Sequence, residues 1–322
     1  MENNIEKPYV IGLDMGGTNS IFGIVDQRGN IKAQTAIKSQ AYPDFKDYVA
    51  AAVEALGPAL DVVGGIEQIR GMGIGAPNAN FYTGCIEGSA NLVWKGNVPL
   101  AQGFEDALGI PVRVTNDANA AAMGEMTYGV ARGMKNFIMI TLGTGVGSGI
   151  VVDGKVVYGS DGYAGELGHV IIDHTGNGRQ CGCGRKGCLE TYCSATGVAR
   201  TAREFLSKSD AASELRNMNP EDITSYDVFL AAEKGDKIAL DIFDYTGTIL
   251  GRSCADFATF NTPEAFVFFG GLTKAGEYLM KPLRKAYEDN VLFMYKNKTK
   301  LLISALNGSE AAVLGASALG WE

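Results

Sequence analysis

One pattern of strands and glycine turns occurs twice in this chain, and it constrains the fold more than any other feature. The first copy runs from Tyr9 to Lys38 and the second from Phe137 to Tyr158. Each copy reads as a strand, a glycine-rich turn, a strand, a short turn and a third strand. The copies start about 130 residues apart, close to the length of one small domain. The sequence therefore predicts two similar α/β halves, each opening with a glycine-tipped hairpin.

Strands and helices also alternate between and after the two copies. We expect a helix over 45–56, a strand ending in GIGAPN (73–78), a strand over 112–114 and a helix opening at NDANAAAMGE. After the second copy we expect mostly helix over 195–258 and a strand over 265–269. The glycine turn GGLTKAG and a helix over SEAAVLGASALGW then complete the chain.

Composition indicates a globular protein and argues against several classes of function. With 322 residues, 46% of them apolar, two domains are expected. The net charge of −8 argues against nucleic-acid binding, which needs a basic face. The first residues carry no apolar signal region and no apolar run could span a membrane, so we expect a cytoplasmic protein. In that reducing compartment, clustered cysteines favour metal binding or redox chemistry over structural disulfides.

Three glycine turns follow strands, at DMGGTN (14–19), LGTGVG (142–147) and GGLTKAG (270–276). Each alone would be an ordinary turn, but glycine also lets a backbone approach a ligand and cradle phosphate oxygens. None fits the P-loop or the dinucleotide-binding pattern. Together, in a duplicated scaffold, they predict one nucleotide in a cleft between two domains.

The segment TNDANAAA places Asp117 between a strand and a helix, where two roles are open. Aspartate is a good N-cap, and this role alone would explain it. The functional alternative is a general base that accepts a proton from an acceptor hydroxyl during phosphoryl transfer. The neighbouring Asn116 could hydrogen-bond the same acceptor.

Both histidines of the chain, His169 and His174, lie just upstream of Cys181, Cys183 and Cys188. One histidine with three cysteines is a common tetrahedral zinc site, and four protein ligands leave no open position for water. We therefore predict a structural zinc. Packed free thiols are the alternative, and a redox pair is disfavoured because no Cys-x-x-Cys is present.

Two glutamates flank this predicted metal loop, Glu166 before His169 and Glu190 after Cys188. Each alone could be a surface carboxylate, but carboxylates also accept hydrogen bonds from sugar hydroxyls. We expect the zinc to position both of them. Loss of a ligand should then weaken sugar binding and leave nucleotide binding nearly unchanged, since the glycine turns are expected to be distant.

The motifs DMGGT, GAP, NDANAAA, LGTGVG, GELGH, CGCGRKGCLE and FGGLTKAG, in this order, resemble the ROK family of sugar kinases and repressors. The resemblance covers about 9–321. The ROK family belongs to the actin-like ATPase superfamily. It implies two actin-like (ribonuclease H-like) α/β domains around a central nucleotide and sugar cleft. The implied domains are 1–117 plus about 305–322, with the C-terminal helix returning to this smaller domain, and 118–304 with the zinc loop.

The resemblance also implies a role for each candidate residue. Asp117 is the catalytic base, and structural Zn²⁺ is held by His169, Cys181, Cys183 and Cys188. His169 is preferred over His174 because it lies in GELGH. The implied sugar contacts are Asn91, Asn116, Asp117, Glu166, His169 and Glu190. The implied contacts to ATP and Mg²⁺ are Asp14, Gly16, Gly17, Thr18, Asn19, Gly143, Thr144, Gly145, Gly270 and Gly271.

Within the family, a sugar kinase is favoured over a repressor. ROK repressors carry an N-terminal helix-turn-helix domain, and about eight residues precede the first strand here. A catalytically dead sensor is disfavoured because Asp117 and the three turns are present.

SANLVWKGNVPL (89–100) resembles the sugar segment of family glucokinases, so glucose is the first choice. N-acetylglucosamine, N-acetylmannosamine and fructose are alternatives, and a homodimer or homotetramer is implied. Many members carry a basic residue directly after GGT, where this chain has Asn19.

Overall fold

The computed structural model describes residues 7–88, 92–306 and 308–322, and the chain divides into two compact units. Unit 1 consists of Met1–Met134, Gly149–Ala164 and Ala305–Glu322. Unit 2 consists of Lys135–Ser148 and Gly165–Ser304. The domain boundaries predicted at 117 and about 305 remain a proposal, and the units differ from them in grouping residues 118–134 and 149–164 with the N-terminal part.

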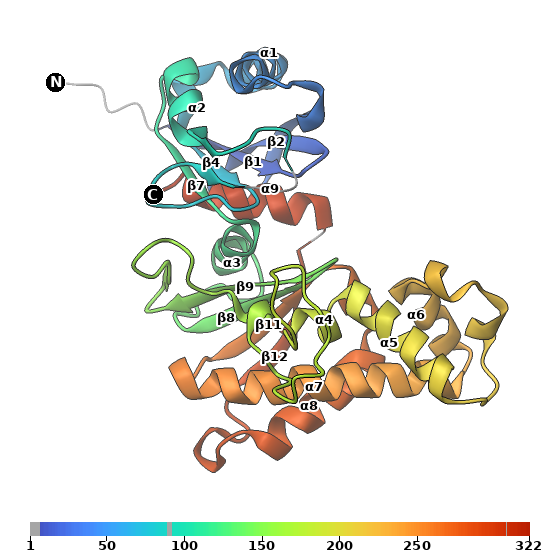
Figure 1. Ribbon diagram of the computed structural model, residues 1–322. Helices are drawn as coiled ribbons and strands as arrows, with labels where there is room; N and C mark the ends of the chain where they lie inside the picture. Colours follow the sequence, from blue (N-terminus) through green and yellow to red (C-terminus); the bar gives the residue numbers. More distant parts are fainter. Residues whose placement is uncertain (1–6, 89–91, 307) are drawn as a thin grey trace. The chain divides into compact units, whose positions relative to one another are not determined.

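Unit 1 contains a five-stranded sheet with the order β3-β2-β1-β4-β7 (Figure 1). Strand β1 pairs antiparallel with β2, β2 pairs antiparallel with β3, and β1, β4 and β7 are parallel. A short hairpin of β5 and β6 lies outside this sheet. The strand bounds are β1 (Tyr9–Met15), β2 (Asn19–Asp26), β3 (Ile31–Lys38), β4 (Ile69–Gly75), β5 (Ile86–Glu87), β6 (Asn97–Val98) and β7 (Val112–Thr115).

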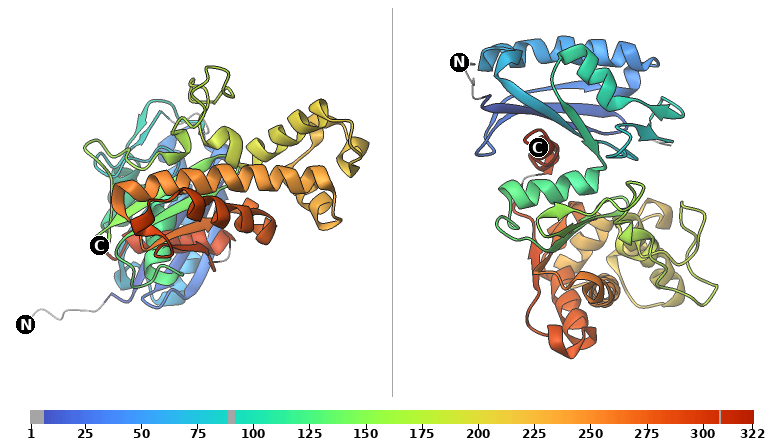
Figure 2. Two further views of the ribbon diagram at one scale, coloured as in Figure 1. Left: turned by 90° about the horizontal axis from the view of Figure 1, so that it is seen from below. Right: turned by 90° about the vertical axis from the view of Figure 1, so that its left-hand side faces the viewer.

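Helices cover both faces of this sheet. Figure 2 shows α1 (Phe45–Val63) and α2 (Leu100–Leu108) on one face and α9 (Gly308–Leu319) on the other. The α9 face carries glycine because the helix backbone lies directly on the strands. A Cβ at Gly12 or Gly73 would overlap a carbonyl oxygen of α9. The C-terminal helix is therefore part of the N-terminal unit, as the family resemblance implies.

A second helix, α3 (Asp117–Tyr128), packs against α9 within unit 1. The two helices approach closely because each has a glycine at the point of contact. A Cβ placed on Gly124 would lie 2.7 Å from the Cα of Gly315. This packing fixes the direction of α3, whose first residue is the candidate base Asp117.

The second sheet has the order β10-β9-β8-β11-β12, which repeats the first sheet strand for strand. The β10–β9 pairing is again antiparallel, and β8, β11 and β12 are again parallel. The structural repeat inferred from the sequence is confirmed. The strand bounds are β8 (Phe137–Leu142), β9 (Val146–Val152), β10 (Lys155–Val156), β11 (Ala265–Phe269) and β12 (Lys300–Ile303).

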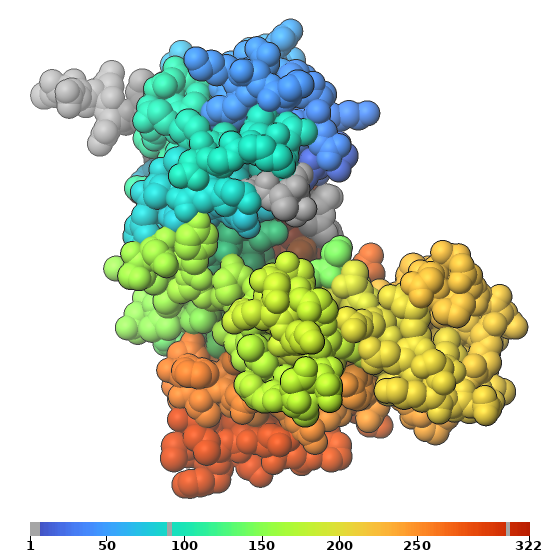
Figure 3. Space-filling model, in the orientation of Figure 1, coloured from blue at the N-terminus to red at the C-terminus, as the bar shows by residue number. Residues whose placement is uncertain are grey.

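The helices of unit 2 fall into two groups. Helices α7 (Lys237–Asn261) and α8 (Glu277–Asn290) lie side by side, with a Cβ at Gly247 reaching 2.7 Å from Leu279 O. Helices α4 (Glu190–Cys193), α5 (Ala195–Lys208) and α6 (Ser225–Glu233) follow the cysteine loop. In Figure 3, α5 and α6 lie at the surface in yellow. The first group supports the sheet, and the second carries residues of the candidate site.

Most predicted elements are confirmed, and the differences have physical reasons. The strands predicted over 31–38 and 265–269 have the predicted bounds. Helix α1 continues beyond the predicted end, through Pro58, to Val63, because Leu56 and Ala59 continue its buried face. Helices α2 and α8 and strand β12 were not predicted. Among the described residues, no helix has the length and apolar character needed to cross a membrane.

Candidate active site and metal centre

The β1–β2 turn holds the first predicted group of nucleotide-binding residues. Gly16 N–H donates to Asn19 O at 2.9 Å, so this amide is used inside the turn. Ser39, directly after β3, also fixes the turn, because its N–H donates to Thr18 O at 2.9 Å. Thr18 and Asn19 remain exposed. Asn19 pairs with Lys38 across β2 and β3, so a lysine lies opposite the residue that directly follows the first glycine turn.

Asp14, near the end of β1, is a half-buried carboxylate with a perturbed pKa. Burial, together with the negative charge of Asp117, raises the pKa of Asp14 from 3.8 to about 6. Unit 1 therefore brings these two predicted site residues close enough to repel each other. Such a carboxylate is suited to face a divalent cation, because a cation would offset both the lost hydration and the repulsion.

The N-cap of α3 is Asn116, not Asp117. The Asn116 side-chain oxygen accepts from Asn119 N–H at 2.7 Å, and Asp117 is the first helical residue. The N-cap alternative for Asp117 is wrong, because backbone geometry places the cap one residue earlier. Asp117 Oδ1 accepts from Ala118 N–H at 2.8 Å, and its other oxygen is left for a different partner.

Asp117 is accessible to water, yet protein surrounds its carboxylate closely enough to change its titration. Burial raises the pKa of Asp117 above 3.8, and the hydrogen bond from Ala118 opposes this shift. An accessible carboxylate with a raised pKa is a stronger base than an ordinary aspartate. The geometry is therefore compatible with proton acceptance.

In unit 2, four candidate metal ligands meet in one cluster. One ligand atom each from His169, Cys181, Cys183 and Cys188 lies within 4.8 Å of all the others. Cys183 Sγ and Cys188 Sγ are 3.7 Å apart, and Cys181 Sγ lies 3.7 Å from His169 Nδ1. Zinc–sulfur bonds of about 2.3 Å at tetrahedral angles place two sulfurs about 3.8 Å apart. The cluster therefore fits a tetrahedral Zn²⁺.

His169 belongs to this cluster, and His174 does not. His169 ends a 3₁₀ turn (Leu167–His169), and its carbonyl accepts from Arg185 Nη2 at 2.9 Å. Its Nδ1 faces Cys181, and its Nε2 lies 3.9 Å from Glu166 Oε2. The ring therefore presents one nitrogen to the cysteines and the other to an exposed glutamate.

Glu190 joins the cysteine loop to the glycine turn 142–147. Its Oε2 accepts from Val146 N–H at 3.0 Å, and its Oε1 accepts from the Cys181 thiol at 3.7 Å. Gly145 makes this possible, because a Cβ there would overlap the Glu190 carboxylate. The expected separation of the metal loop from this turn is therefore wrong: packing brings together residues that are 44 positions apart.

We predict that Gly145→Ala displaces Glu190 and raises the KM for a sugar substrate. The new methyl group would lie 3.1 Å from Glu190 Cδ and would overlap its Oε2. We expect a rise of about 10-fold, since a misplacement of about 1 Å can cost up to about 100-fold. The KM of the variant is measured by steady-state kinetics. Gly57→Ala, whose Cβ meets nothing within 4 Å, is the control and should leave the KM unchanged.

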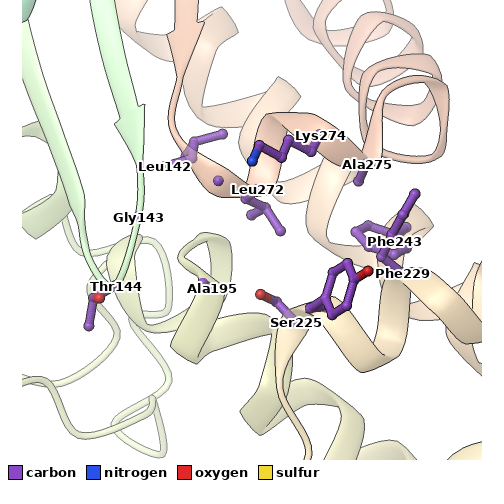
Figure 4. A pocket seen from close by; sticks show the side chains of 12 residues that line it. Leu142, Gly143, Thr144, Ala195, Ser225, Phe229, Phe243, Leu272, Lys274 and Ala275 are labelled. Atoms are coloured by element: carbon purple, nitrogen blue, oxygen red, sulfur yellow. The ribbon is translucent and has the colours of Figure 1, made fainter. Parts of the chain in front are cut away.

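A pocket of about 440 Å³ lies beside the same turn in unit 2. Three predicted residues, Gly143, Thr144 and Gly271, line it, and the Cβ positions of Gly143 and Gly271 face open space. Gly270 does not line the pocket; it has a φ of +109° and a Cβ position 2.8 Å from Leu142 C, so it packs directly on the end of β8. Figure 4 shows Thr144 on one side and Phe229 and Phe243 on the other.

Of the remaining lining residues, those at 142 and 272–275 lie in two of the predicted glycine turns, and the sequence did not point to those on α5, α6 and α7. The additional lining residues come from five separate segments: Leu142, Ala195, Ser225, Tyr226, Phe229, Phe243, Leu272, Lys274 and Ala275. No local spacing relates these segments, since they converge through the packing of α5, α6 and α7 on one another and of the 3₁₀ turn Gly271–Ala275 on α6 and β8. Apolar walls with a few polar groups and accessible glycine backbone are typical of a nucleotide-base site. The predicted sugar contact Asn91 lies outside the described residues.

Two sheets of one topology, with glycine turns after their first strands and an aspartate leading α3, define an actin-like two-domain α/β protein of the kinase class. The chain belongs to the ROK family, which matches residues 10–322. It is 36% identical to a glucokinase of Halalkalibacterium halodurans over 97% of this chain and 94% of the relative. It is 34% identical to a glucokinase of Thermotoga maritima over 97% of both.

Solved structures show the same relationship. The crystal structure of a ROK family glucokinase from Streptomyces griseus in complex with glucose and AMPPNP has a TM-score of 0.77 and 32% identity. It covers 97% of this chain and 98% of its own. A ROK hexokinase from Thermus thermophilus has a TM-score of 0.82 at 28% identity, covering 97% of this chain and 98% of its own. The fold class predicted from the motifs is confirmed.

Proposed function

We propose that this protein is an ATP-dependent glucokinase that transfers the γ-phosphoryl group of ATP to the 6-hydroxyl of glucose. The observation that carries the proposal is the similarity to the S. griseus glucokinase with glucose and AMPPNP, at 32% identity over 97% of this chain. Curated relatives named glucokinase, at 33–36% identity, support it. ATP-dependent hexokinase activity is the broader class.

Asp117 is the general base in this proposal. Phosphoryl transfer needs a carboxylate that takes the acceptor proton while the acceptor oxygen attacks phosphorus and ADP departs. Two observations support this role: the helix cap is supplied by Asn116, and burial raises the pKa of Asp117. The proton moves from the glucose 6-hydroxyl to Asp117 Oδ2, the carboxylate oxygen that does not accept from Ala118 N–H. Asn116 keeps its amide NH₂ for the sugar, since only its oxygen is used by the cap.

The nucleotide contacts come from the three glycine turns. The apolar pocket beside Gly143 and Gly271 suits the adenine ring, and the exposed Thr18 and Asn19 suit the phosphates. Asp14 would hold Mg²⁺, which neutralises phosphate charge when it is bound with ATP. The remaining proposed contacts are Gly16, Gly17, Thr144 and Gly270, while Gly145 acts by admitting the Glu190 carboxylate.

The sugar contacts in unit 2 are Glu166, His169 and Glu190. They converge on the metal cluster, with His169 Nε2 3.9 Å from Glu166 Oε2 and Glu190 Oε1 3.7 Å from Cys181 Sγ. A structural Zn²⁺ on His169 and the three cysteines would hold these carboxylates in place. We also propose Asn91 as a sugar contact, on the family resemblance of its segment alone. A homodimer or homotetramer is the proposed assembly, which sedimentation analysis tests.

An ATP-consumption screen tests the proposal. The purified protein with Mg-ATP is offered glucose, mannose, fructose, N-acetylglucosamine and N-acetylmannosamine, and ADP release is measured for each. We expect the highest kcat/KM for glucose, with phosphate on the 6-hydroxyl by NMR. A higher kcat/KM for an N-acetylhexosamine would assign that substrate instead. No stimulation by any sugar would contradict kinase function.

We predict that Tyr226→Ala raises the KM for ATP and leaves the KM for glucose unchanged. Tyr226 lines the pocket and is 64% exposed, so truncating it should not disturb the core. Loss of one base–aromatic contact of about 1–3 kcal/mol raises the KM by about 10-fold. Tyr82→Ala removes a tyrosine of similar exposure, 58%, that does not line the pocket. If both variants raise the ATP KM equally, the pocket is not the base site.

A further inference from the structure

Arg179, two residues before Cys181, is almost completely buried, with 5% of its surface exposed. It lies in the metal loop, yet it is not one of the cluster ligands. A buried guanidinium requires partners for its donors, since an unpaired buried charge is strongly destabilising. The partners that Arg179 has show which parts of unit 2 it connects.

The Arg179 guanidinium reaches the junction of α4 and α5. Nη1 donates to Thr191 O at 2.7 Å and to Gly197 O at 3.2 Å. Nη2 donates to Thr201 Oγ1 at 2.9 Å and to Glu204 Oε2 at 2.7 Å. Nε donates to Glu204 Oε1 at 3.1 Å, so the contact with the carboxylate is bidentate. This planar fork gives geometry that a lysine ammonium cannot supply.

Tyr192 completes the enclosure of Arg179. The guanidinium carbon lies 4.4 Å from the centre of the Tyr192 ring. The Tyr192 hydroxyl accepts from Arg179 N–H at 3.2 Å and donates to Asp173 Oδ2 at 3.0 Å. The backbone and the side chain of Arg179 are therefore both fixed, and the loop that carries Cys181 is tied to the helix that carries Glu190.

The α4–α5 junction touches both candidate subsites. At its start, Glu190 contacts Cys181 and Val146 N–H. At its end, Ala195 N–H donates to Gly143 O at 2.8 Å and Thr196 Oγ1 donates to Thr144 O at 2.8 Å. Gly143, Thr144 and Ala195 line the nucleotide pocket. A shift of this junction would move a sugar-binding carboxylate and a nucleotide-binding turn together.

We propose that Arg179 is a positioning residue that holds the α4–α5 junction, so that Glu190 and the Gly143–Thr144 turn are placed together. It neither lines the pocket nor belongs to the metal cluster. The inference rests on the proposed function, because Glu190 and the pocket are assigned there. A purely stabilising network would instead affect unfolding and leave the substrate affinities of the folded protein unchanged.

Arg179→Lys in the full-length, zinc-loaded protein tests this. We expect the KM for glucose and the KM for ATP both to rise by about 10-fold, within the 10–100-fold range usual for supports of a metal site. Zinc should stay stoichiometric, since all four ligands remain. Its transfer to a colour-forming chelator should become about 10-fold faster, because the loop before Cys181 is less restrained.

Arg200→Gln is the matched control. Arg200 also pairs with Glu204, at 3.2 Å, and makes one long, exposed contact of 3.5 Å with Gln180 O, but its side chain is 41% exposed and it does not reach the α4–α5 carbonyls. We expect both KM values and the zinc transfer rate to stay within twofold of wild type, because exposed pairs contribute little. Glu204→Gln should reproduce the Arg179→Lys effect in part, and the double variant should fall short of the sum of the two.

A folded Arg179→Lys protein with both KM values and the zinc transfer rate within twofold of wild type would overturn the proposal. An increase in only one of the two KM values would contradict the claim that Arg179 positions Glu190 and the Gly143–Thr144 turn together. If Arg179→Lys does not fold, Glu204→Gln provides the same readouts. If the wild type phosphorylates no sugar, the proposed function fails, and zinc transfer still decides whether Arg179 restrains the loop.

Discussion

Asp117→Asn is expected to lower kcat by roughly 10²–10⁴-fold, the usual contribution of a general base. The substitution preserves the helix start, because Asn116 is the N-cap of α3 and the one backbone contact of the Asp117 carboxylate with Ala118 N–H can be kept by an amide oxygen. Asparagine keeps the size and a hydrogen-bonding oxygen for Ala118 N–H but cannot accept the hydroxyl proton. Glucose binding, measured by calorimetry, should be largely retained.

The pH dependence of kcat/KM supplies a second readout for Asp117. Only the ionised carboxylate accepts a proton, so activity is lost as the pH falls through its pKa. Because burial raises that pKa above 3.8, the acid limb should lie at a higher pH than for an ordinary aspartate. The limb should disappear from the residual activity of Asp117→Asn.

Asn116→Ser is the control, because serine also caps helices. It should keep the melting temperature within a few degrees and leave the acid limb of the pH profile in place. If Asp117→Asn turns over nearly as fast as wild type, the base assignment is wrong. If Asp117→Asn mainly lowers the melting temperature, Asp117 is structural.

Cys183→Ser should abolish stoichiometric zinc binding and raise the KM for glucose by about 10–100-fold, the effect usual for loss of support in a metal site. Cys183 is one of the four clustered ligands, and its sulfur lies 3.7 Å from that of Cys188. Hydrogen bonding from the Arg185 backbone also lowers the pKa of Cys183 to about 6, which favours the thiolate that zinc binds. Elemental analysis and steady-state kinetics measure the two effects.

The KM for ATP should rise as well, although less than the KM for glucose. Glu190 accepts from Val146 N–H and contacts Cys181, so release of the cysteine loop loosens the glycine turn 142–147. An unchanged KM for ATP would show that this contact does not transmit the change. An unchanged KM for glucose would contradict the positioning role of the metal, even if zinc were lost.

Cys85→Ser is the matched control, because Cys85 is a half-buried cysteine outside the cluster. It should keep zinc and both KM values. His169→Ala and His174→Ala separate the two histidines, since only loss of His169 should release the metal. Active wild-type protein without stoichiometric metal would contradict the zinc assignment.

The sequence alone determined the fold class and the chemical inventory of the site. Strand and turn signals are local, so the repeat of 9–38 in 137–158 predicted two similar halves, and the structure confirms the repeat as two sheets of one topology. The motifs identified the carboxylates, the three cysteines and the histidines for the same reason, since residue types and short spacings are visible in the chain.

Tertiary structure decided which of these residues meet. Backbone geometry made Asn116, not Asp117, the N-cap of α3, and loop packing put His169 rather than His174 beside the cysteines. Packing also placed Glu190 on Val146 and enclosed Arg179, contacts between segments that no local spacing relates. The physical reason is that local propensities are set by neighbours in sequence, whereas a site is assembled by long-range packing, which fixes distances between residues far apart in the chain.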